Sequence, residues 1–426
     1  MLLRRISCLI KRVNEASRLT GTNRGFERAN CAKVLVLSLT LLGLTTSLNF
    51  AYAQIGGSIA IEQRYFPEDS LYFEQANSQA SLVVAPEFET SLGDGFLSFK
   101  PFARLDQRDS ERTHADIREL MYAYFFDDWE VRAGIGKVFW GQTESLHLVD
   151  IINQTDFVES IDNEDKLGQP MLDVRYLLDS GAISFYVLPY FRERTFAGVE
   201  GRLRGPLPID VDRPLFESED ENSNIDYAVR WQQSIGNLEL GLAYFDGTSR
   251  LPDIQVAIDE FGTPSLLPQY NQLQQFSIDA LYVFGSALFK LEAIRGETLD
   301  QDFSAYVAGL EYTLVNFYDT GFDLGWLLEH QYDERENQAF IWGQNDLMIG
   351  ARLQLNDFAG SEILFGFVRD LDNSGSYSAS VEGSTRLNQN WRISLNGYFF
   401  SATVEEDPVY FLRRDDHITL SLEYFF

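Results

Sequence analysis

Cysteine is nearly absent from this chain of 426 residues, and both cysteines, Cys8 and Cys31, lie close to the N-terminus. The remainder of the chain therefore has no disulfide framework, and a cysteine-free chain can pass through an oxidising compartment without mispairing. Beyond the N-terminal region, no apolar run reaches the roughly 18 residues that a membrane-spanning helix needs. This absence disfavours an α-helical membrane protein.

Positive charge is also scarce: 34 Lys and Arg stand against 64 Asp and Glu, for a net charge of −30. So negative a field disfavours nucleic acid as a partner. Two interpretations of the acidity stay open. It can keep long loops soluble during export, or it can form a surface that attracts cations.

Motifs for catalysis are missing too. The four histidines are widely spaced, and neither a Gly-rich phosphate loop nor a Gly-x-Ser-x-Gly elbow is present, so no catalytic residue, metal site or cofactor is predicted. Asp415-Asp416-His417 has the residue types of the Asp-His pair of outer-membrane proteases. A histidine after two acids at the junction of a loop and a strand is more often a solvated edge.

The first 53 residues have the features of an export leader. A basic region precedes the mostly apolar stretch Val34 to Leu44, and Ala51-Tyr52-Ala53 is a small-x-small cleavage site before Gln54. We therefore predict a signal peptide at 1–53 and a single domain at 54–426. An uncleaved N-terminal anchor is the alternative.

Alternation with a period of two dominates the rest of the chain. In the last segment, Ile418, Leu420 and Leu422 fall on one face and Ser421 and Glu423 on the other. The segments are about ten residues long, the length that a tilted strand needs to cross a bilayer. We count eighteen: 57–66, 79–92, 95–107, 115–127, 129–141, 170–178, 182–196, 225–235, 237–246, 270–284, 287–296, 303–315, 321–333, 346–356, 361–370, 377–387, 391–402 and 416–426.

Short connections with turn-forming residues alternate with long polar ones, such as 67–78, 197–224, 247–269 and 403–415. Both ends of the series fall on the side of the short turns, which requires an even number of strands. The sequence therefore predicts an all-β fold, a transmembrane up-and-down antiparallel β-barrel of about 18 strands, with 16 as the alternative. The cell outer membrane is the predicted location.

Two segments resemble known outer-membrane families. Phe426, ending an alternating strand, resembles the assembly signal that the barrel assembly machinery reads. Segment 129–156 resembles a stretch of porin-like families, largely uncharacterised, in which Arg-x-Gly-x-Gln-x-x-x-Trp-Gly precedes Asp-x-x-Asn-Pro-x-Asp. Gly136 and Gln154 depart from this pattern, at its Gln and its Pro. The matching residues are Arg132, Gly134, Trp140, Gly141, Asp150, Asn153 and Asp156. The resemblance implies a passive or weakly selective channel.

The loop 142–169 follows the fifth predicted strand, and its stretch 146–152 is too apolar for a solvated loop. Its position is similar to that of the general-porin loop that folds into the barrel. We hypothesise the same here, with an acidic side facing inward arginines across a constriction. The alternative is that these charged residues only form ion pairs along a solvated lumen. The acidic residues are Glu144, Asp150, Asp156, Glu159 and Asp162, and the arginines are Arg132, Arg175, Arg192, Arg194, Arg230, Arg352 and Arg392.

The function expected from these patterns is passive diffusion of small hydrophilic or charged solutes through an outer-membrane channel, without enzymatic activity. Outer-membrane lipid and lipopolysaccharide, the assembly machinery and the solutes are the expected partners, and a homo-oligomer is left open. Two alternatives remain: a phospholipase- or protease-like barrel enzyme, and a structural or receptor barrel with a blocked lumen.

Overall fold

The computed structural model describes residues 53–426, except 73, 259–261, 263, 300, 337–342 and 406. Apart from its last residue, the predicted signal peptide lies outside the described residues. Residues 53–426 form one compact unit. The helices among the described residues are short 3-10 turns, at Glu221–Ser223, Phe317–Asp319 and Pro408–Leu412. No helix in the described ranges is long and apolar enough to span a membrane.

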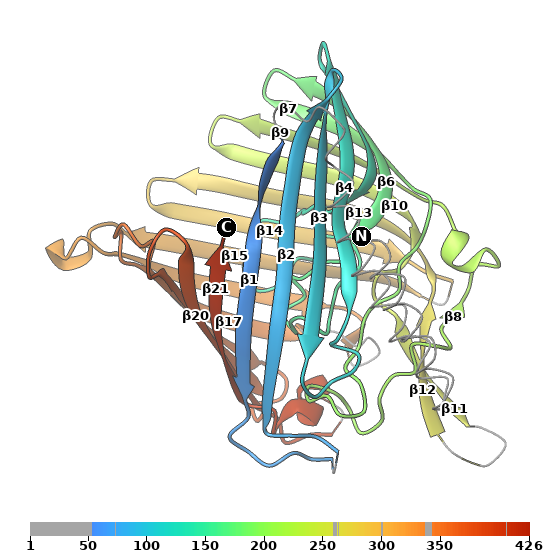
Figure 1. Ribbon diagram of the computed structural model, residues 1–426, viewed down its shortest axis with the longest axis vertical. Coiled ribbons are helices and arrows are strands. Elements are labelled where there is room, and N and C mark those ends of the chain that lie inside the picture. The colour runs from blue at the N-terminus through green and yellow to red at the C-terminus, as the bar shows by residue number, and fades with distance from the viewer. Residues whose placement is uncertain are drawn as a thin grey trace, which may run out of the picture. The chain divides into compact units, whose positions relative to one another are not determined.

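Eighteen strands in the described part of the chain form one closed antiparallel sheet (Figure 1). Each strand pairs with its neighbours in the chain, and the last pairs with the first, from Ser58 opposite Phe425 to Tyr65 opposite Ile418. The strands are β1 (Gln54–Tyr65), β2 (Ser78–Leu92), β3 (Gly95–Asp106), β4 (Ala115–Phe126), β5 (Trp129–Gly136), β6 (Gln169–Leu178), β7 (Gly181–Leu188), β9 (Asp226–Ile235), β10 (Leu238–Thr248), β13 (Gln272–Phe284), β14 (Ala287–Glu297), β15 (Asp302–Leu314), β16 (Asp323–Asp333), β17 (Asn345–Gln354), β18 (Glu362–Asp370), β19 (Tyr377–Arg386), β20 (Trp391–Ser401) and β21 (His417–Phe425).

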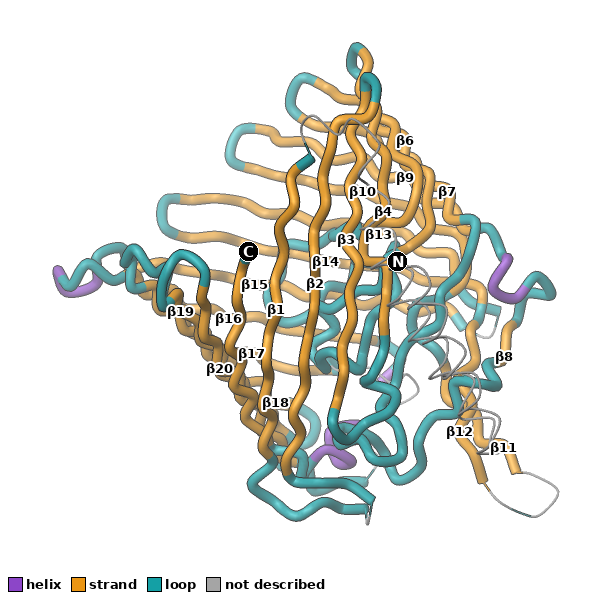
Figure 2. The backbone as a smooth tube through the Cα atoms, viewed as in Figure 1, coloured by secondary structure: helices purple, strands orange, loops and turns teal. Residues whose placement is uncertain are grey.

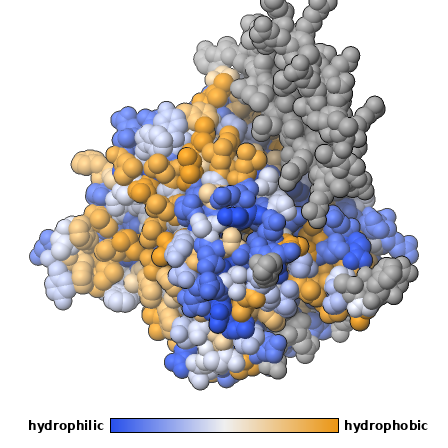
Figure 3. Space-filling view, turned by 60° about the horizontal axis from the view of Figure 1, so that its bottom comes forward, coloured by the Kyte–Doolittle hydropathy of each residue, from blue (hydrophilic) through white to orange (hydrophobic). Residues whose placement is uncertain are grey.

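The alternation in the sequence sets which face of each strand looks outward. On β21, Ile418, Leu420 and Leu422 are exposed, whereas His417 is buried. Figure 3 shows apolar side chains over the outer wall and polar ones gathered over the loops at the nearer end. A closed ring has no free edge, so every wall residue can satisfy its backbone hydrogen bonds without water. The eighteen-strand barrel predicted from the sequence is confirmed, and 16 strands are excluded.

The connections differ between the two ends of the barrel (Figure 2). One end carries tight turns, two of them built on Gly236 and Gly285, whose positive φ of 61° and 62° suits glycine. The other end carries most of the long loops, as predicted.

Two predicted strands end early, and three short strands were not predicted. β5 ends at Gly136 rather than 141, and β7 ends at Leu188 rather than 196. The apolar side chains beyond these ends, including Trp140 and Phe191, are buried away from the wall, so their alternation did not mark membrane-spanning strand. Within the predicted loops 197–224 and 247–269 and just past the latter, β8 (Leu215–Phe216), β11 (Asp253–Ile258) and β12 (Pro264–Tyr270) form a separate three-stranded sheet.

Candidate pore and constriction

The chain between β5 and β6, which we call the constriction loop (137–168), crosses the lumen. At its far end, the backbone N–H groups of Gln142 and Thr143 donate to Glu292 Oε1 on β14 at 2.7 and 3.0 Å, and that of Val149 donates to Glu292 Oε2 at 3.2 Å. The N–H groups of Glu144 and Ser145 donate to Glu329 on β16 at 2.8 and 2.9 Å. Because β14 and β16 lie on another part of the ring from β5, these contacts place the loop inside the barrel.

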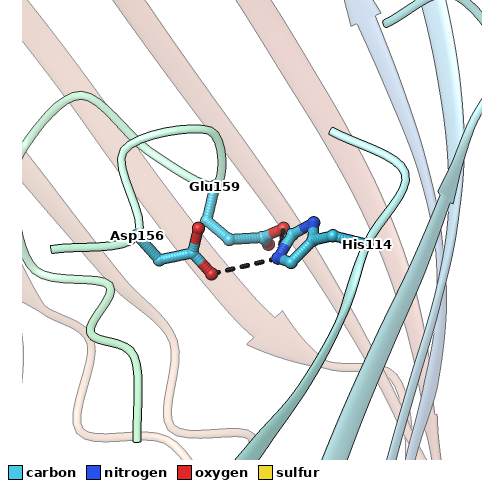
Figure 4. Close-up of side chains that lie close together, drawn as sticks. All are labelled: His114, Asp156 and Glu159. Atoms are coloured by element: carbon cyan, nitrogen blue, oxygen red, sulfur yellow. Dashed lines mark hydrogen bonds and ion pairs between the residues drawn. The ribbon is translucent and has the colours of Figure 1, made fainter. Parts of the chain in front are cut away.

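The near end of the loop is held by buried ion pairs to β3 and β4. Glu159 pairs with Arg104 at 2.5 Å, and Asp156 pairs with Arg118. His114, just before β4, lies between the two carboxylates, with Nε2 3.0 Å from Asp156 Oδ2 (Figure 4). Burial alone would raise the pKa of Asp156, but the hydrogen bond with His114 and the charges of His114 and Arg118 outweigh it and lower that pKa.

His114, Asp156 and Glu159 are also spaced like metal ligands, with ligand atoms within 4.8 Å of one another. The spacing of histidines in the sequence gave no sign of this group, because it is assembled from a strand end and a distant loop. Both carboxylates already bind a guanidinium group. A metal ion would have to compete with two fixed cations, so the donor set fits a cross-link better than a metal site.

An apolar cluster fixes the middle of the loop to one side of the lumen. Val149 and Ile152 are fully buried, and Trp140 packs edge-on to Tyr186 with ring centroids 5.6 Å apart. Their neighbours come from the inner face of β4 through β15, and include Met121, Met171, Leu188, Phe245, Leu273, Ile294 and Phe303. The apolar stretch 146–152 is therefore explained by packing within the barrel, where the loop lies against this side of the lumen.

Open space remains beside the loop in two cavities. The first, here the pore cavity, has a volume of 510 Å³ and lies between the loop tip and the inner face of β16 to β20. The second, here the vestibule cavity, has a volume of 660 Å³ and lies between the loop and the segments around 249–255 and 271–275. Both are lined by Leu146, His147, Asp162 and Asn163, so the two cavities meet at these loop residues.

The two cavities differ in charge. Among the described residues, the lining of the pore cavity has two arginines, Arg352 and Arg392. Its eight described carboxylates are Glu144, Asp162, Glu164, Asp346, Glu362, Asp370, Glu382 and Asp407. The described lining of the vestibule cavity is balanced, with four acidic residues and four lysines and arginines. The pore cavity is therefore acidic, and the vestibule cavity beside it is close to neutral.

The acidic residues expected at the constriction separate into three places. Glu144 lines the pore cavity and pairs with Arg352 at 2.6 Å. Asp150 lines the vestibule cavity, where it pairs with Lys166 at 3.2 Å. Asp156 lines neither cavity, because it lies in the buried network at the near end.

The seven expected arginines do not form one ladder opposite the loop. Arg132, Arg175 and Arg230 pair with carboxylates of the barrel wall, at 3.8 Å for Arg175–Glu130 and 2.7 Å for Arg230–Asp279. Arg192 pairs with Asp116 at 2.7 Å. The partners of Arg132 and Arg175 lie opposite them on neighbouring strands, whereas Arg230 reaches across β10 to Asp279 and Arg192 reaches from beyond β7 to β4. The sequence pattern alone does not reveal these pairings.

Glu292 and Glu329, which hold the loop tip, were not among the residues predicted from the sequence. Both side chains point inward from strands that were correctly predicted, and both are almost completely buried. A carboxylate in the middle of a strand is a signal for a buried partner. The partners of these two carboxylates are backbone N–H groups of a distant loop, however. Every residue except proline has such a group, so the sequence does not show which ones will bind.

The Asp-His arrangement near the C-terminus does not form an open catalytic pair. His417 is 2% exposed, and its Nδ1 lies 2.8 Å from the carbonyl oxygen of Asp415. The carboxylate of Asp415 instead pairs with Arg202 at 2.5 Å. This geometry fits a structural role at the base of β21.

A closed antiparallel barrel with an apolar outer wall and a polar lumen is a transmembrane barrel of the kind found in bacterial outer membranes. No protein-family model matches the sequence, and no curated protein matches it. Among solved structures, the chain is similar to OccK11 (OpdR) of Pseudomonas aeruginosa, with 8% identity, a TM-score of 0.49, and 88% of this chain and 95% of that chain covered.

Two further structures have comparable scores. OprB of Pseudomonas putida is 10% identical, with a TM-score of 0.46 over 88% of this chain and 94% of that one. OmpT of Vibrio cholerae, in a trimer form, is 11% identical, with a TM-score of 0.45 over 88% and 99%. Because these scores are low, the assignment of the barrel depends on the strand pairing of this chain itself.

Proposed function

We propose that this protein is a porin-like channel for passive diffusion of small hydrophilic or charged solutes across the outer membrane. One observation supports this most directly: the constriction loop packs against one side of the lumen and leaves the pore cavity open beside β16 to β20. A barrel of roughly 16–18 strands is wide enough for an aqueous channel. The loop reduces that width to a passage that can discriminate between solutes.

The charges along the pore cavity favour cations. Glu144 is matched by Arg352, but among the described residues neither Asp162 nor Glu382 forms an ion pair. The Tyr398 hydroxyl lies 3.0 Å from one carboxylate oxygen of each and can donate its proton to one of them. Carboxylates without a fixed counter-ion attract mobile cations and repel anions from a narrow pore. The sequence led us to expect acidic loop residues facing a row of arginines. In this proposal the pore is instead lined mainly by negative charge.

Planar-bilayer recording of the refolded protein tests this proposal. We expect stable conductance steps in KCl and, under a salt gradient, a reversal potential that shows preference for K⁺ over Cl⁻. The triple variant Glu362→Gln, Asp370→Asn and Glu382→Gln should lose most of that preference.

A matched control removes the same three charges from the external segment before β9, away from both cavities: Glu219→Gln, Asp220→Asn and Glu221→Gln. This control should keep the preference for K⁺. No conductance at any salt concentration would defeat the channel and favour a blocked barrel, whereas equal loss in both triple variants would defeat the role of the pore cavity.

Export, assembly and association belong to the same proposal. Residues 1–53 would direct export, and Phe426 would serve as the signal for the assembly machinery. In support, the N–H of Phe426 donates to the carbonyl oxygen of Gly57 at 3.1 Å, so the last residue takes part in closing the ring. The apolar outer wall would contact lipid, and homo-oligomers remain an alternative to the monomer.

A further inference from the structure

Arg194 differs from the other basic residues that line the vestibule cavity. Arg250 pairs with Asp226 at 2.7 Å, Arg335 with Asp333 at 2.6 Å and Lys166 with Asp150 at 3.2 Å. Arg194 has no carboxylate within ion-pair distance among the described residues, although it is only 9% exposed.

The contacts of Arg194 hold its guanidinium in place without neutralising it. One Nη donates to Asn163 Oδ1 at 2.5 Å, and the guanidinium lies 4.6 Å from the centroid of the Phe157 ring. Burial lowers the pKa of Arg194 to about 10, and Tyr270 acts in the opposite direction. A buried cation that keeps its charge without a counter-ion favours an anionic ligand, and the planar guanidinium suits a carboxylate.

The opposite charge is found just across the junction of the two cavities. Asp162 precedes Asn163 in the chain and lines both cavities. Its Oδ2 lies 3.0 Å from the Tyr398 hydroxyl, which is also 3.0 Å from Glu382 Oε1. The two carboxylates therefore lie close together on the pore side, and among the described residues neither forms an ion pair.

We propose that this junction is a binding site for zwitterionic solutes of the amino-acid type, with the carboxylate on Arg194 and the ammonium group at Asp162 and Glu382. The site rests on the proposed channel function and names the class of solute that the channel favours. A molecule with both charges satisfies both ends of the junction, whereas an anion or a cation of the same length satisfies one. The apolar residues beside Arg194, Phe157 among them, would contact the carbon chain between the charges.

Three probes of similar size separate the two charges: 4-aminobutanoate, butanoate and butylammonium. Each is added to the open channel in KCl, and the concentration that reduces the current by half is measured. We expect 4-aminobutanoate to act at a concentration at least several-fold lower than the other two. Arg194→Gln should raise that concentration about tenfold or more, because a charge-assisted hydrogen bond pair is lost.

Two further variants complete the design. Asp162→Asn should weaken the effect of 4-aminobutanoate and of butylammonium, but not that of butanoate. Arg213→Gln is the matched control, since Arg213 is 56% exposed in an external loop, pairs with Asp210 and lines neither cavity. Equal action of the three probes, or an unchanged response in Arg194→Gln, overturns the proposal.

Calorimetric titration of the same probes into the detergent-solubilised barrel measures binding without conductance. A preference for 4-aminobutanoate that Arg194→Gln abolishes supports the site even if the bilayer experiment shows no channel. Normal KCl conductance with no preference among the probes in either measurement refutes the site and leaves the channel intact. Arg194→Lys, which keeps the charge, should retain part of the preference and so separates loss of charge from misfolding.

Discussion

The hold of Glu292 on the tip of the constriction loop can be tested by one isosteric change, Glu292→Gln. The carboxylate accepts four hydrogen bonds: three at Oε1, from Gln142 N, Thr143 N and Thr143 Oγ1, and one at Oε2, from Val149 N. Glutamine keeps the shape of the side chain but replaces one acceptor oxygen by an NH₂ donor. Whichever way the amide turns, at least one N–H of the loop then faces another donor.

The expected cost follows from these contacts. Leaving one buried donor without a partner costs about 1–3 kcal/mol, and the remaining bonds lose the contribution of a charged acceptor. A total of about 2–4 kcal/mol would increase the population of the released tip by roughly 30- to 1000-fold, since each 1.4 kcal/mol is about a factor of ten. The bonds from Glu329 to residues 144 and 145 would still hold part of the tip.

Thiol labelling measures this population directly. Both natural cysteines, Cys8 and Cys31, lie in the predicted leader, so the chain from residue 54 onward has none. Val149→Cys would place a single thiol at a fully buried position within the docked loop, facing the barrel interior. We expect Glu292→Gln to speed its labelling by a membrane-impermeant reagent and to add flicker to the single-channel current.

The matched control is Glu239→Gln, on the inward face of β10, because among the described residues no ion pair or side-chain hydrogen bond joins this exposed carboxylate to the constriction loop. If labelling and current noise are the same in Glu292→Gln and in the control, the tip is not held by this carboxylate, and our account of the constriction is wrong.

Three further predictions concern the loop and the closure of the ring. Trp140→Ala should destabilise the barrel by roughly 3–5 kcal/mol in urea unfolding, because a buried aromatic side chain is lost; a cost below that of a surface substitution would contradict the packing. For His114, burial alone would lower the pKa, but Asp156 and Glu159 outweigh burial and raise the pKa above the ordinary 6.5. Its stabilisation of the loop is therefore full below pH 6.5 and lost as pH rises through the raised pKa, so current flicker should increase with pH and become independent of pH in His114→Gln. Phe426→Ala should slow insertion by the assembly machinery in a reconstituted assay, with unchanged insertion as the contrary result.

The barrel could be predicted from the sequence because its signal repeats in every strand. Alternation along β21, with Leu420 outward and Ser421 inward, is a local pattern imposed by the two different media on the faces of one sheet. The same pattern misled at 137–141 and 189–196, where apolar side chains such as Trp140 pack inside the lumen instead of against lipid. Alternation reports burial and does not say what covers the side chain.

The inward position of the loop was also predictable, because the apolar stretch 146–152 needed a dry surface. The partners of its charges were not. Arg230 meets Asp279 across two strand pairings, and Glu292 meets backbone groups more than a hundred residues earlier in the chain. Such contacts depend on the register of the ring and on the path of the loop. Neither is fixed by a local pattern.

Because the constriction loop packs against only one side of the barrel, the strands differ in the free energy of their local unfolding. Strands from β4 to β15 are supported from within by the apolar cluster, while β17 to β20 border the water of the pore cavity and have lipid on the other side. Wall strands that lack an inner support open at lower free energy than strands that share a core. Amide exchange should therefore be fastest in β17 to β20, and the segment that bounds the passage should also be the segment from which unfolding begins.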